Sequence, residues 1–420
     1  MSTIYLTSLG CRLNQAEMLA LGRRLSALGY SLAQEPGDAG TIVCNTCAVT
    51  QEAERKSRQL LRRLRRDNPG ARIVAVGCYS ELGSGVGGEF QAGDLLLGSE
   101  LKRALLARPQ DFLTAVEPDT APVVAPRAKT RALLRIQEGC DNRCTYCMVW
   151  RLRGPQRSRP AGEVLAEARE LLADGYREIV LTGVHIGAYG RDLSGSSELS
   201  ALIEALLAET KLSRLRLSSI EPWDLAALDV SLWQNERLCP HLHVPLQSGS
   251  DTVLERMGRR YDTEEYMGLA EHLYAHIPDL AVTADLIVGF PGESEDEFEA
   301  SLAFVRRCGF ARLHVFPYSS RPGTVAASLA GQVPLPTRRE RARRMRGLAS
   351  DLAFRFEERF VGRTLPVLWE QRRGSQWSGL TPNHLRVRCE SECDLRNSVT
   401  ETHIAGRGER GLTGKLLSAI

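Results

Sequence analysis

Short apolar runs alternate with helical stretches along most of this 420-residue chain, and the alternation restricts its fold more than any other feature. Near the N-terminus, the runs 3–9, 41–47, 71–78 and 94–99 are predicted strands, and the amphipathic or basic stretches that follow them are predicted helices. Strands that alternate with helices favour an open, parallel α/β sheet. Six more strand candidates, most of them followed by a helical pattern, lie within 132–319 and predict an incomplete (βα)6 barrel.

The last part of the chain has a different pattern. A long basic helical stretch at 336–360 leads into a tail with β-type alternation, glycines and turns. That tail predicts a small β-barrel of a kind that often binds oligonucleotides. The stretch 116–130, rich in Pro, Ala and Val, has no periodicity and is predicted to be a linker. We therefore expect three domains, at residues 1–115, 130–355 and 358–420.

Composition narrows the class of protein. The N-terminus lacks the basic start and apolar run of a secretory signal, and no apolar stretch approaches the roughly 18–20 residues that span a bilayer. We therefore expect a cytoplasmic protein without a membrane partner. The chain has 11 cysteines, an odd number. In a reducing compartment such a set is better interpreted as metal ligands and buried thiols than as a disulfide framework.

The strongest chemical motif is "EGCDNRCTYCMVW", in which Cys140, Cys144 and Cys147 form a C-x3-C-x2-C triplet directly after the first predicted barrel strand. Three thiolates on one loop can hold three irons of a [4Fe–4S] cluster and leave the fourth iron open to another ligand. Zinc is an alternative, but a structural zinc site needs four ligands, and the nearest histidine, His185, is on a later strand. A set of buried structural thiols is a third reading.

A second group of cysteines is spread over the N-terminal part. Cys11, Cys47 and Cys78 each lie at or just after the end of a predicted strand. In an open α/β sheet ligands gather at that edge, so these three residues could converge there. Each could instead be a buried thiol. Cys44, which alternates with its strand, is expected to be core.

The triplet resembles that of the radical S-adenosylmethionine enzymes, which have an aromatic residue before the last cysteine, here Tyr146. The resemblance implies a cluster whose open iron chelates S-adenosyl-L-methionine and, when reduced, cleaves it to a 5′-deoxyadenosyl radical. It also implies cofactor contacts at the strand ends. These are Thr182 and Gly183 near the methionine amino group, Ser218, Ser219 and Glu221 near the ribose, Gln247 in the same mouth, and Gly289 at the turn along the adenine. Trp150 stands where the family usually has proline.

The whole chain is similar to the methylthiotransferases, through "LGCRLNQ", "CNTCAVT", "VGCYS", the barrel and the β-type tail. The resemblance implies a second [4Fe–4S] cluster held by Cys11, Cys47 and Cys78, and a tail of the RNA-binding type named TRAM. The residues of the motifs, including "GCRLNQAE" and "LTGVHIGAYG", resemble most the branch of this family that methylthiolates carbon 2 of N6-threonylcarbamoyladenosine beside the tRNA anticodon. The alternatives are isopentenyladenosine in tRNA and an aspartate of a ribosomal protein.

A tRNA partner, contacted at its anticodon stem-loop, has independent support in the sequence. Arg55, Arg58, Arg62 and Arg65 recur at helical spacing and are predicted to share one helix face, where guanidinium groups suit phosphate. The family also implies an electron donor such as flavodoxin or ferredoxin. A non-catalytic iron–sulfur RNA-binding protein is the competing class, but the intact triplet argues against it. The histidines at 185, 241, 243 and 314 and the pair Cys389 and Cys393 are expected to be structural.

Overall fold

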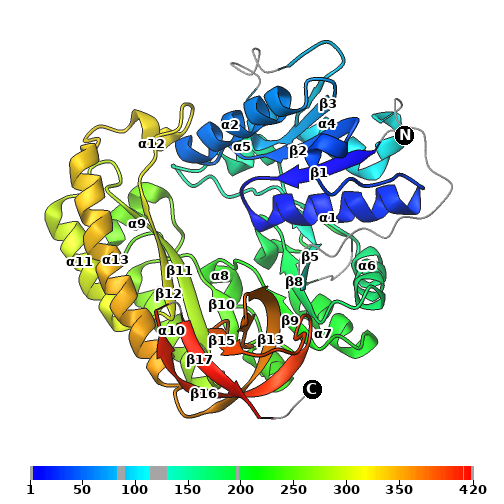
Figure 1. Ribbon diagram of the computed structural model, residues 1–420. Helices are drawn as coiled ribbons and strands as arrows, with labels where there is room; N and C mark the ends of the chain where they lie inside the picture. Colours follow the sequence, from blue (N-terminus) through cyan, green and yellow to red (C-terminus); the bar gives the residue numbers. More distant parts are fainter. Residues whose placement is uncertain (1–2, 83–89, 114–129, 195–197, 410, 418–420) are drawn as a thin grey trace.

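The computed structural model describes residues 3–82, 90–113, 130–194, 198–409 and 411–417 (Figure 1). The N-terminal part is a parallel sheet in the order β1-β2-β3-β4. Its strands are β1 (Ile4–Ser8), β2 (Thr41–Thr46), β3 (Arg72–Gly77) and β4 (Leu95–Leu97). The helices that follow them are α1 (Arg12–Ala27), α2 (Gln51–Asp67), α3 (Cys78–Glu81) and α4 (Ser99–Ala107). The prediction of a parallel α/β sheet is confirmed, whereas most of the predicted linker lies outside the described residues.

Six parallel strands form the barrel, in two hydrogen-bonded groups of three. The first group is β5 (Arg131–Arg135), β8 (Glu178–Thr182) and β9 (Arg214–Leu217), and the second is β10 (His241–His243), β11 (Ala281–Val288) and β12 (Arg312–Pro317). Isolated parallel bridges, Leu215 with Leu238 and Ser219 with His243, join the two groups. The predicted incomplete barrel is therefore present, and its two edge strands, β5 and β12, leave it open on one side (Figure 1).

Helices pack on the outside of these strands. They are α6 (Ala161–Ala173), α7 (Leu199–Glu209), α9 (Asp251–Met257), α10 (Thr263–His276), α11 (Glu295–Cys308) and the long α13 (Leu335–Glu358). The shorter elements are the hairpin β6 (Gln137–Glu138) with β7 (Arg157–Ser158), and the helices α5 (Val149–Arg153), α8 (Pro222–Leu225) and α12 (Val325–Ser328). Reciprocal capping boxes fix where two helices begin, Asp262 with Glu265 at α10 and Ser294 with Glu297 at α11. None of the described helices combines the length and apolar character that a bilayer crossing requires.

Alternation along the barrel strands separates an apolar outer face from a polar inner face. On β10, β11 and β12 the residues Leu242, Ala284 and Val315 belong to the core shared with the outer helices. Successive side chains of a strand point to opposite sides. Their neighbours in sequence therefore point to the concave side, and these neighbours include His243 and His314. The barrel consequently presents polar side chains to its lumen.

The tail forms a closed barrel in the order β13-β14-β15-β17-β16, as expected. Its strands are β13 (Thr364–Arg373), β14 (Gln376–Leu380), β15 (Arg386–Glu390), β16 (Val399–Gly408) and β17 (Gly411–Leu416). Trp369 and Trp377 fill its core. Cys389 packs in that core and Cys393 is exposed, so neither joins a metal-type cluster among the described residues.

Two arginines of β9 attach the tail to the six-stranded barrel. Arg214 donates to the carbonyl of Leu380 over 2.9 Å, and Arg216 donates to that of Pro382 over 2.7 Å. Arg216 also pairs with the buried Glu178 at 2.7 Å. Because a buried guanidinium is stable only when its donors are used, these contacts fix the tail against the barrel strands.

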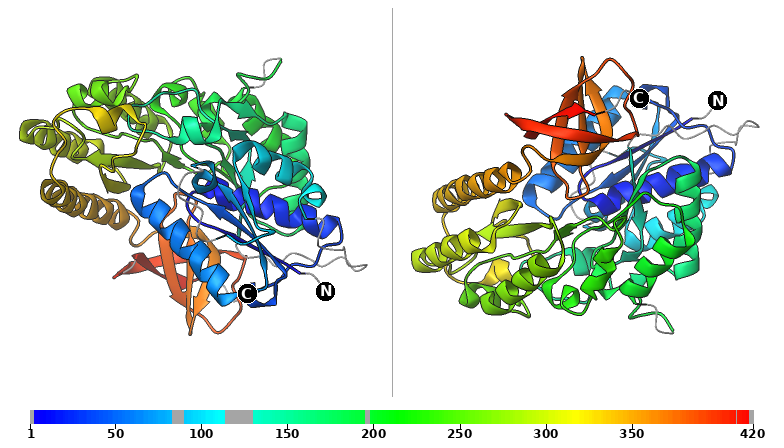
Figure 2. Two further views of the ribbon diagram at one scale, coloured as in Figure 1. Left: turned by 90° about the horizontal axis from the view of Figure 1, so that it is seen from above. Right: turned by 90° about the horizontal axis from the view of Figure 1, so that it is seen from below.

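A buried network of four charges connects the N-terminal sheet to the barrel. Lys102 of α4 lies 2.8 Å from Glu17 of α1 and 3.0 Å from Glu138 of β6. Arg153 of α5 lies 2.9 Å from Glu17 and 3.3 Å from Glu138. Figure 2 shows α1 lying along the barrel strands, and α1 contacts β5 and β8. Two cations and two carboxylates thus neutralise one another in the space between the two parts.

The network depends on ionised carboxylates. Burial by itself would raise the pKa of Glu17, but the charges of Arg153 and Lys102 lower it to about 2. A carboxylate with a lowered pKa in the folded state contributes stability above its ordinary value of 4.5, and this contribution is lost as the pH falls toward about 2.

Lys102→Met is expected to destabilise the protein by about 3–5 kcal/mol, because it removes a buried cation and leaves Arg153 as the one charged partner of the buried Glu17 among the described residues. Lys56→Met is the matched control. Lys56 pairs with Glu52 on the exposed surface of α2, and its loss is expected to change stability by less than about 0.5 kcal/mol. Urea unfolding of both variants measures the difference. Equal losses would show that the network adds no more than a surface pair.

Candidate active site

The C-x3-C-x2-C triplet lies on the loop between β6 and α5, at the carboxyl end of the first barrel strand. Each of its sulfurs has a polar neighbour. Cys140 Sγ lies 4.0 Å from Nδ1 of His185, Cys144 Sγ accepts from Arg259 Nη1 over 3.4 Å, and Cys147 Sγ accepts from a backbone N–H over 3.4 Å. Hydrogen bonds to sulfur are a feature of cluster thiolates. The donor set therefore fits an iron–sulfur cluster.

The pKa values of these thiols support that fit. Burial, together with the neighbouring Cys144 and Cys140, raises the pKa of Cys147 to about 12. Burial likewise raises the pKa of Cys144. Three thiols that disfavour one another's negative charge share one small space, and a bound cation is what makes such a set stable as thiolates.

Gly139, directly before Cys140, shows why the loop turns so sharply. Its φ is +73°, and a Cβ there would lie 1.9 Å from the carbonyl oxygen of Pro155. Only glycine accepts this conformation without strain. Trp150, in the usual proline position, lies in α5 and stacks between the guanidinium groups of Arg143 and Arg151, at 5.2 and 5.3 Å.

Two polar groups lie beside the triplet: His185, which was expected to be structural, and Arg259, which was not singled out from the sequence. His185 hydrogen-bonds the buried Asp224 through Nε2. Burial would lower the pKa of His185, but Asp224 and Cys140 raise it to about 9. Arg259 lies over the Trp223 ring at 5.1 Å and pairs with Glu221. The carboxylate predicted to contact a ribose is therefore shared with Arg259, a partner that spacing along the chain could not reveal.

The other predicted cofactor contacts gather at the carboxyl ends of the strands. Thr182 is the last residue of β8, and its Oγ1 donates to the carbonyl of Val180 over 3.1 Å. A Cβ on Gly183 would lie within 3.0 Å of both Ile186 and Gln137. Among the described residues, the buried Oγ of Ser218 has no hydrogen-bond partner. A buried hydroxyl without a partner is costly, so this atom fits a site whose ligand completes it.

Four further predicted residues border the same region. Gln247 has a left-handed backbone, with φ of +64°. Its backbone N–H and carbonyl both form hydrogen bonds with β11. The N–H of Gly289 donates to Glu293 over 2.8 Å, and a Cβ there would collide with Arg338. Tyr146 makes an edge contact with Phe290, at 6.5 Å between ring centroids. Ser219 bridges to the last residue of β10.

The second cysteine set converges at the edge of the N-terminal sheet. Cys11, Cys47 and Cys78 directly follow β1, β2 and β3 or lie within three residues of them. A Cβ on Gly10, whose φ is +97°, would lie 2.6 Å from Cβ of Cys47. Burial raises the pKa of Cys47 to about 11, with Cys78 and Cys11 adding to the effect. Cys44 lies in the core, as predicted.

The segment that follows the triplet reaches the second cysteine set. Met148 and Leu152 of this segment pack with Cys78 and Tyr79 in one apolar cluster. Arg153 ends α5, six residues after Cys147; burial raises the pKa of Cys78, and the charge of Arg153 opposes that effect. The loop of the triplet and the edge of the N-terminal sheet are therefore in direct contact.

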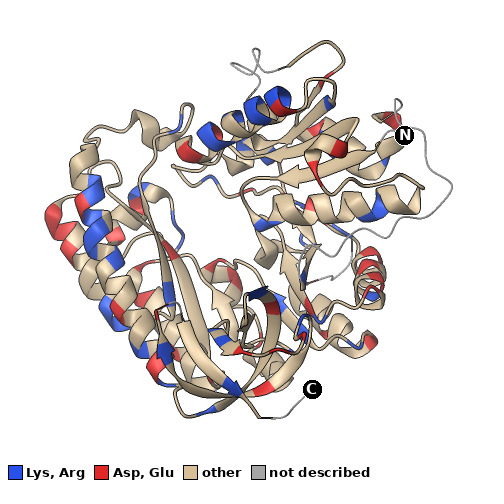
Figure 3. Cartoon of the chain, in the orientation of Figure 1, with Lys and Arg blue, Asp and Glu red and all other residues tan. Residues whose placement is uncertain are grey.

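The basic face of α2 is only partly as expected. Figure 3 shows Lys and Arg along this helix. Arg55 is exposed, and Arg58 lies 3.5 Å from Glu54. Arg65, however, binds both carboxylate oxygens of Asp94 at 2.6 Å and donates to three backbone carbonyls. The prediction that it presents its charge outward with the others is wrong, because Asp94, distant in sequence, uses that charge.

The histidines that were expected to be structural fall into two groups. His241 stacks on His384 at 4.5 Å between ring centroids, which confirms packing for His241. His243 and His314, which were also expected to pack, instead lie with Asp285 in one cluster on the concave side of the barrel.

The chain matches two family models. The Radical SAM superfamily matches residues 134–305, and a family described as "Uncharacterized protein family UPF0004" matches residues 3–98. The first implies a [4Fe–4S] cluster and S-adenosylmethionine. The fold is similar to that of a radical S-adenosylmethionine methyltransferase from Kitasatospora setae with cobalamin and a [4Fe–4S] cluster bound, with a TM-score of 0.55, 14% identity, and 78% and 77% of the two chains covered.

Curated relatives cover nearly the whole chain. A threonylcarbamoyladenosine tRNA methylthiotransferase of Thermotoga maritima is 35% identical over 88% of this chain and 87% of its own, and one of Bacillus subtilis is 34% identical over 97% and 95%. A tRNA-2-methylthio-N(6)-dimethylallyladenosine synthase of Sphingopyxis alaskensis is 34% identical over 100% and 98%. Identity of this extent shows that the chain belongs to the radical S-adenosylmethionine methylthiotransferase family.

Proposed function

We propose that this enzyme attaches a methylthio group to carbon 2 of N6-threonylcarbamoyladenosine next to the anticodon of a tRNA. The observation that carries the proposal is that the segment directly after the first triplet packs, through Met148 and Leu152, against Cys78 of the second. One triplet alone suits radical chemistry, and a second, close to it, suits delivery of sulfur to the same carbon. The names of the Thermotoga maritima and Bacillus subtilis relatives support the nucleoside.

We assign the first cluster to Cys140, Cys144 and Cys147, and a second [4Fe–4S] cluster to Cys11, Cys47 and Cys78. When bound, the first cluster and S-adenosylmethionine supply a carbon radical able to take hydrogen from an unactivated carbon. The overall change replaces a C–H bond by a C–S bond to a methylthio group. It consumes two molecules of S-adenosylmethionine, one for the methyl group and one for the radical, and one sulfide-level sulfur from a sulfur donor. The electrons come from an external donor, a role suited to flavodoxin or ferredoxin.

The chain itself contributes the surroundings of that chemistry. Arg259 donates to a sulfur of the first triplet, His185 lies 4.0 Å from another, and the charge of Arg153 acts on Cys78 of the second. The Ser218 hydroxyl, the Gly183 turn and the Gly289 turn line the strand ends where S-adenosylmethionine is expected. No side-chain acid or base is needed to remove the hydrogen, because the cofactor performs that step.

For the tRNA we propose the basic face of α2, including Arg55 and Arg58, together with the C-terminal β-barrel. Phosphate contacts of this type position an RNA, and the base is selected where it enters the barrel. A substrate of this kind puts the enzyme in the cytoplasm, and we propose residues 1–115, 130–355 and 358–420 as its three functional units.

A second candidate substrate is dimethylallyl- (isopentenyl-) adenosine. The relative from Sphingopyxis alaskensis has that activity in its name and is as similar to this chain as the Bacillus subtilis protein. A ribosomal-protein aspartate is the third.

Anaerobically reconstituted protein is expected to hold about eight irons per chain, four for each cluster. Replacing Cys11, Cys47 and Cys78 together by Ala, or the triplet at 140, 144 and 147, is expected to leave about four in either case. Iron analysis and electron paramagnetic resonance measure both. A chain that binds about four irons with all six cysteines intact would contradict the second cluster.

Gly10→Ala is expected to lose the second cluster alone, because the new Cβ would collide with Cys47 in a backbone conformation that alanine resists. Gly70→Ala, where nothing lies within 4 Å of the new Cβ, is the matched control and is expected to bind iron normally. Iron content and the absorbance of the reconstituted proteins report the outcome. Equal iron in the two variants would show that the Gly10 position does not shape the second site.

Deleting the gene is expected to remove the methylthio form of threonylcarbamoyladenosine from total tRNA and to accumulate its precursor. Nucleoside mass spectrometry measures both species. Loss of the dimethylallyl (isopentenyl) counterpart would instead select the second candidate, and an unchanged tRNA would direct attention to ribosomal protein. A non-catalytic RNA-binding role predicts no change in any modified nucleoside.

A further inference from the structure

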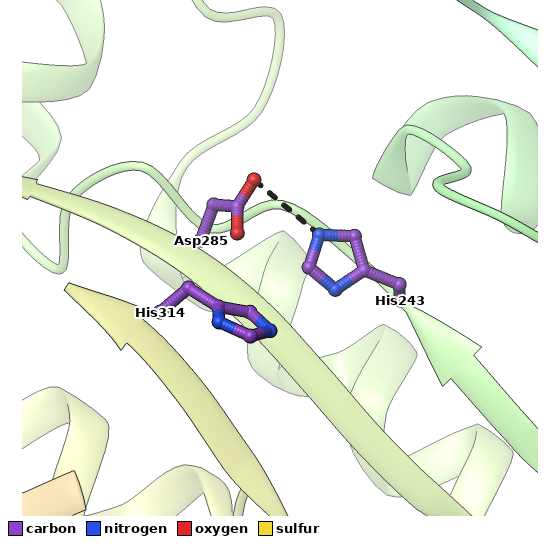
Figure 4. Close-up of side chains that lie close together, drawn as sticks. All are labelled: His243, Asp285 and His314. Atoms are coloured by element: carbon purple, nitrogen blue, oxygen red, sulfur yellow. Dashed lines mark ion pairs between the residues drawn. The ribbon is translucent and has the colours of Figure 1, made fainter. Parts of the chain in front are cut away.

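The inner face of the barrel holds a polar cluster that the proposed cofactors do not use. His243, Asp285 and His314 come from the three neighbouring strands β10, β11 and β12 (Figure 4). In each strand the adjacent residues pack into the outer core, so these three side chains point to the lumen. His314 is exposed and the other two are half-buried, which shows that solvent reaches this part of the lumen.

The three side chains converge. One polar atom from each lies within 4.8 Å of the others. Nε2 of His243 is 3.4 Å from a carboxylate oxygen of Asp285, and the two histidine rings lie 5.9 Å apart between centroids. Nδ1 of His243 is 2.9 Å from the hydroxyl of Thr283, which orients the ring. The cluster therefore offers ring nitrogens and a carboxylate to one point in the lumen.

Arg12 adds a positive charge from the opposite side. It is the first residue of α1, the helix that lies against β5, and it is exposed. Desolvation and the charges of Arg131 and Arg216 lower its pKa, whereas Glu178 and Asp285 act in the opposite direction. All four of these residues belong to barrel strands, and α1 packs against β5 and β8, so the charge of Arg12 faces the barrel.

Arg12, unlike Arg131 and Arg216, has no partner among the described residues; the same holds for Arg312, which shares a face of β12 with His314. Arg131 pairs with Glu370 at 2.7 Å, and Arg216 with Glu178 at the same distance. No hydrogen bond or ion pair joins Arg12 to any part of the chain that the structure describes. Its charge acts on His314 across the lumen. A partly desolvated guanidinium without a protein partner is suited to bind a carboxylate through two parallel hydrogen bonds.

The two candidate nucleosides differ in the chemistry that such a lumen distinguishes. A threonylcarbamoyl arm carries one carboxylate, one hydroxyl and two N–H groups. A dimethylallyl arm contains only carbon and hydrogen, and placing it here would desolvate charges without a compensating bond. Guanidinium and imidazole N–H groups match the carboxylate, while the Asp285 carboxylate matches the hydroxyl or the N–H groups.

We propose that Arg12, His243 and His314, together with Asp285, form a subsite that binds the carboxylate-bearing arm of the substrate nucleoside and thereby selects it over a hydrocarbon arm. This inference rests on the proposed function and adds the residues that determine specificity. Arg12 is placed to contact the carboxylate, and the cluster on β10–β12 to contact the remaining polar groups of the arm.

The experiment uses the reconstituted full chain and three anticodon stem-loop RNAs that carry threonylcarbamoyladenosine, dimethylallyladenosine or unmodified adenosine at the same position. Methylthio product is quantified by mass spectrometry, and Kd is measured by fluorescence anisotropy. Arg12→Gln and His314→Asn are each expected to raise KM and Kd for the threonylcarbamoyl RNA by about 10- to 100-fold, the loss typical of a hydrogen bond to a charged group. Kd for the unmodified RNA is expected to stay constant.

The controls separate this role from an effect on the clusters. Arg12→Lys is expected to restore much of the affinity, since it keeps the charge. Arg24→Gln changes an exposed arginine in the last turn of the same helix and is expected to have no effect. Iron content is measured for every variant. If Arg12→Gln loses iron through its neighbour Cys11, His314→Asn, on the far side of the lumen, decides the question.

Each outcome has a definite meaning. If the unaltered enzyme gives no product from the threonylcarbamoyl RNA, the proposed substrate is wrong and the subsite falls with it. If it gives product but KM and Kd do not change in His314→Asn and in iron-replete Arg12→Gln, the proposed function stands and the subsite is overturned. One equivalent of zinc bound by the unaltered chain and lost in His314→Asn would show a metal site in its place.

Discussion

The buried network of Glu17, Lys102, Glu138 and Arg153 is the interaction on which the arrangement of this enzyme depends. A single charge in that position would be too costly to bury, so the two carboxylates and the two cations require one another. They come from α1 and α4 on one side and from β6 and α5 on the other. The N-terminal sheet and the barrel can therefore meet in only one way, with both cysteine sets at their contact.

Arg153 has a double part in this arrangement. The same guanidinium that completes the network acts electrostatically on Cys78. The residue lies on the helix that follows the triplet, so the placement of one cysteine set is mechanically linked to the other. A shift of α5 would disturb the charge balance, the apolar cluster around Met148 and the second cysteine set together.

The barrel combines a polar lumen with an apolar outer face. Alternating side chains place Leu242, Ala284 and Val315 outside, against the helices, and leave the opposite side free for polar groups. Low in the lumen the cations are paired, as Arg216 is with Glu178, and serve to attach the C-terminal barrel. Arg12 acts electrostatically on strand residues of the same barrel but has no hydrogen-bond or ion-pair partner among the described residues, so its charge is available to a ligand.

The sequence by itself determined the fold class, because the alternation of strands and helices is a local property that burial enforces along the chain. It also determined the six cysteines of the proposed cluster sites, since their positions after strands follow from the same pattern. It could not determine the partners of charged side chains. Arg65 of α2 pairs with Asp94 and is not part of the basic face. Glu221 pairs with Arg259. His243 and His314 lie in the lumen with Asp285 and not in the core. These outcomes depend on ion pairs between residues far apart in the chain, and only the tertiary structure brings those residues together.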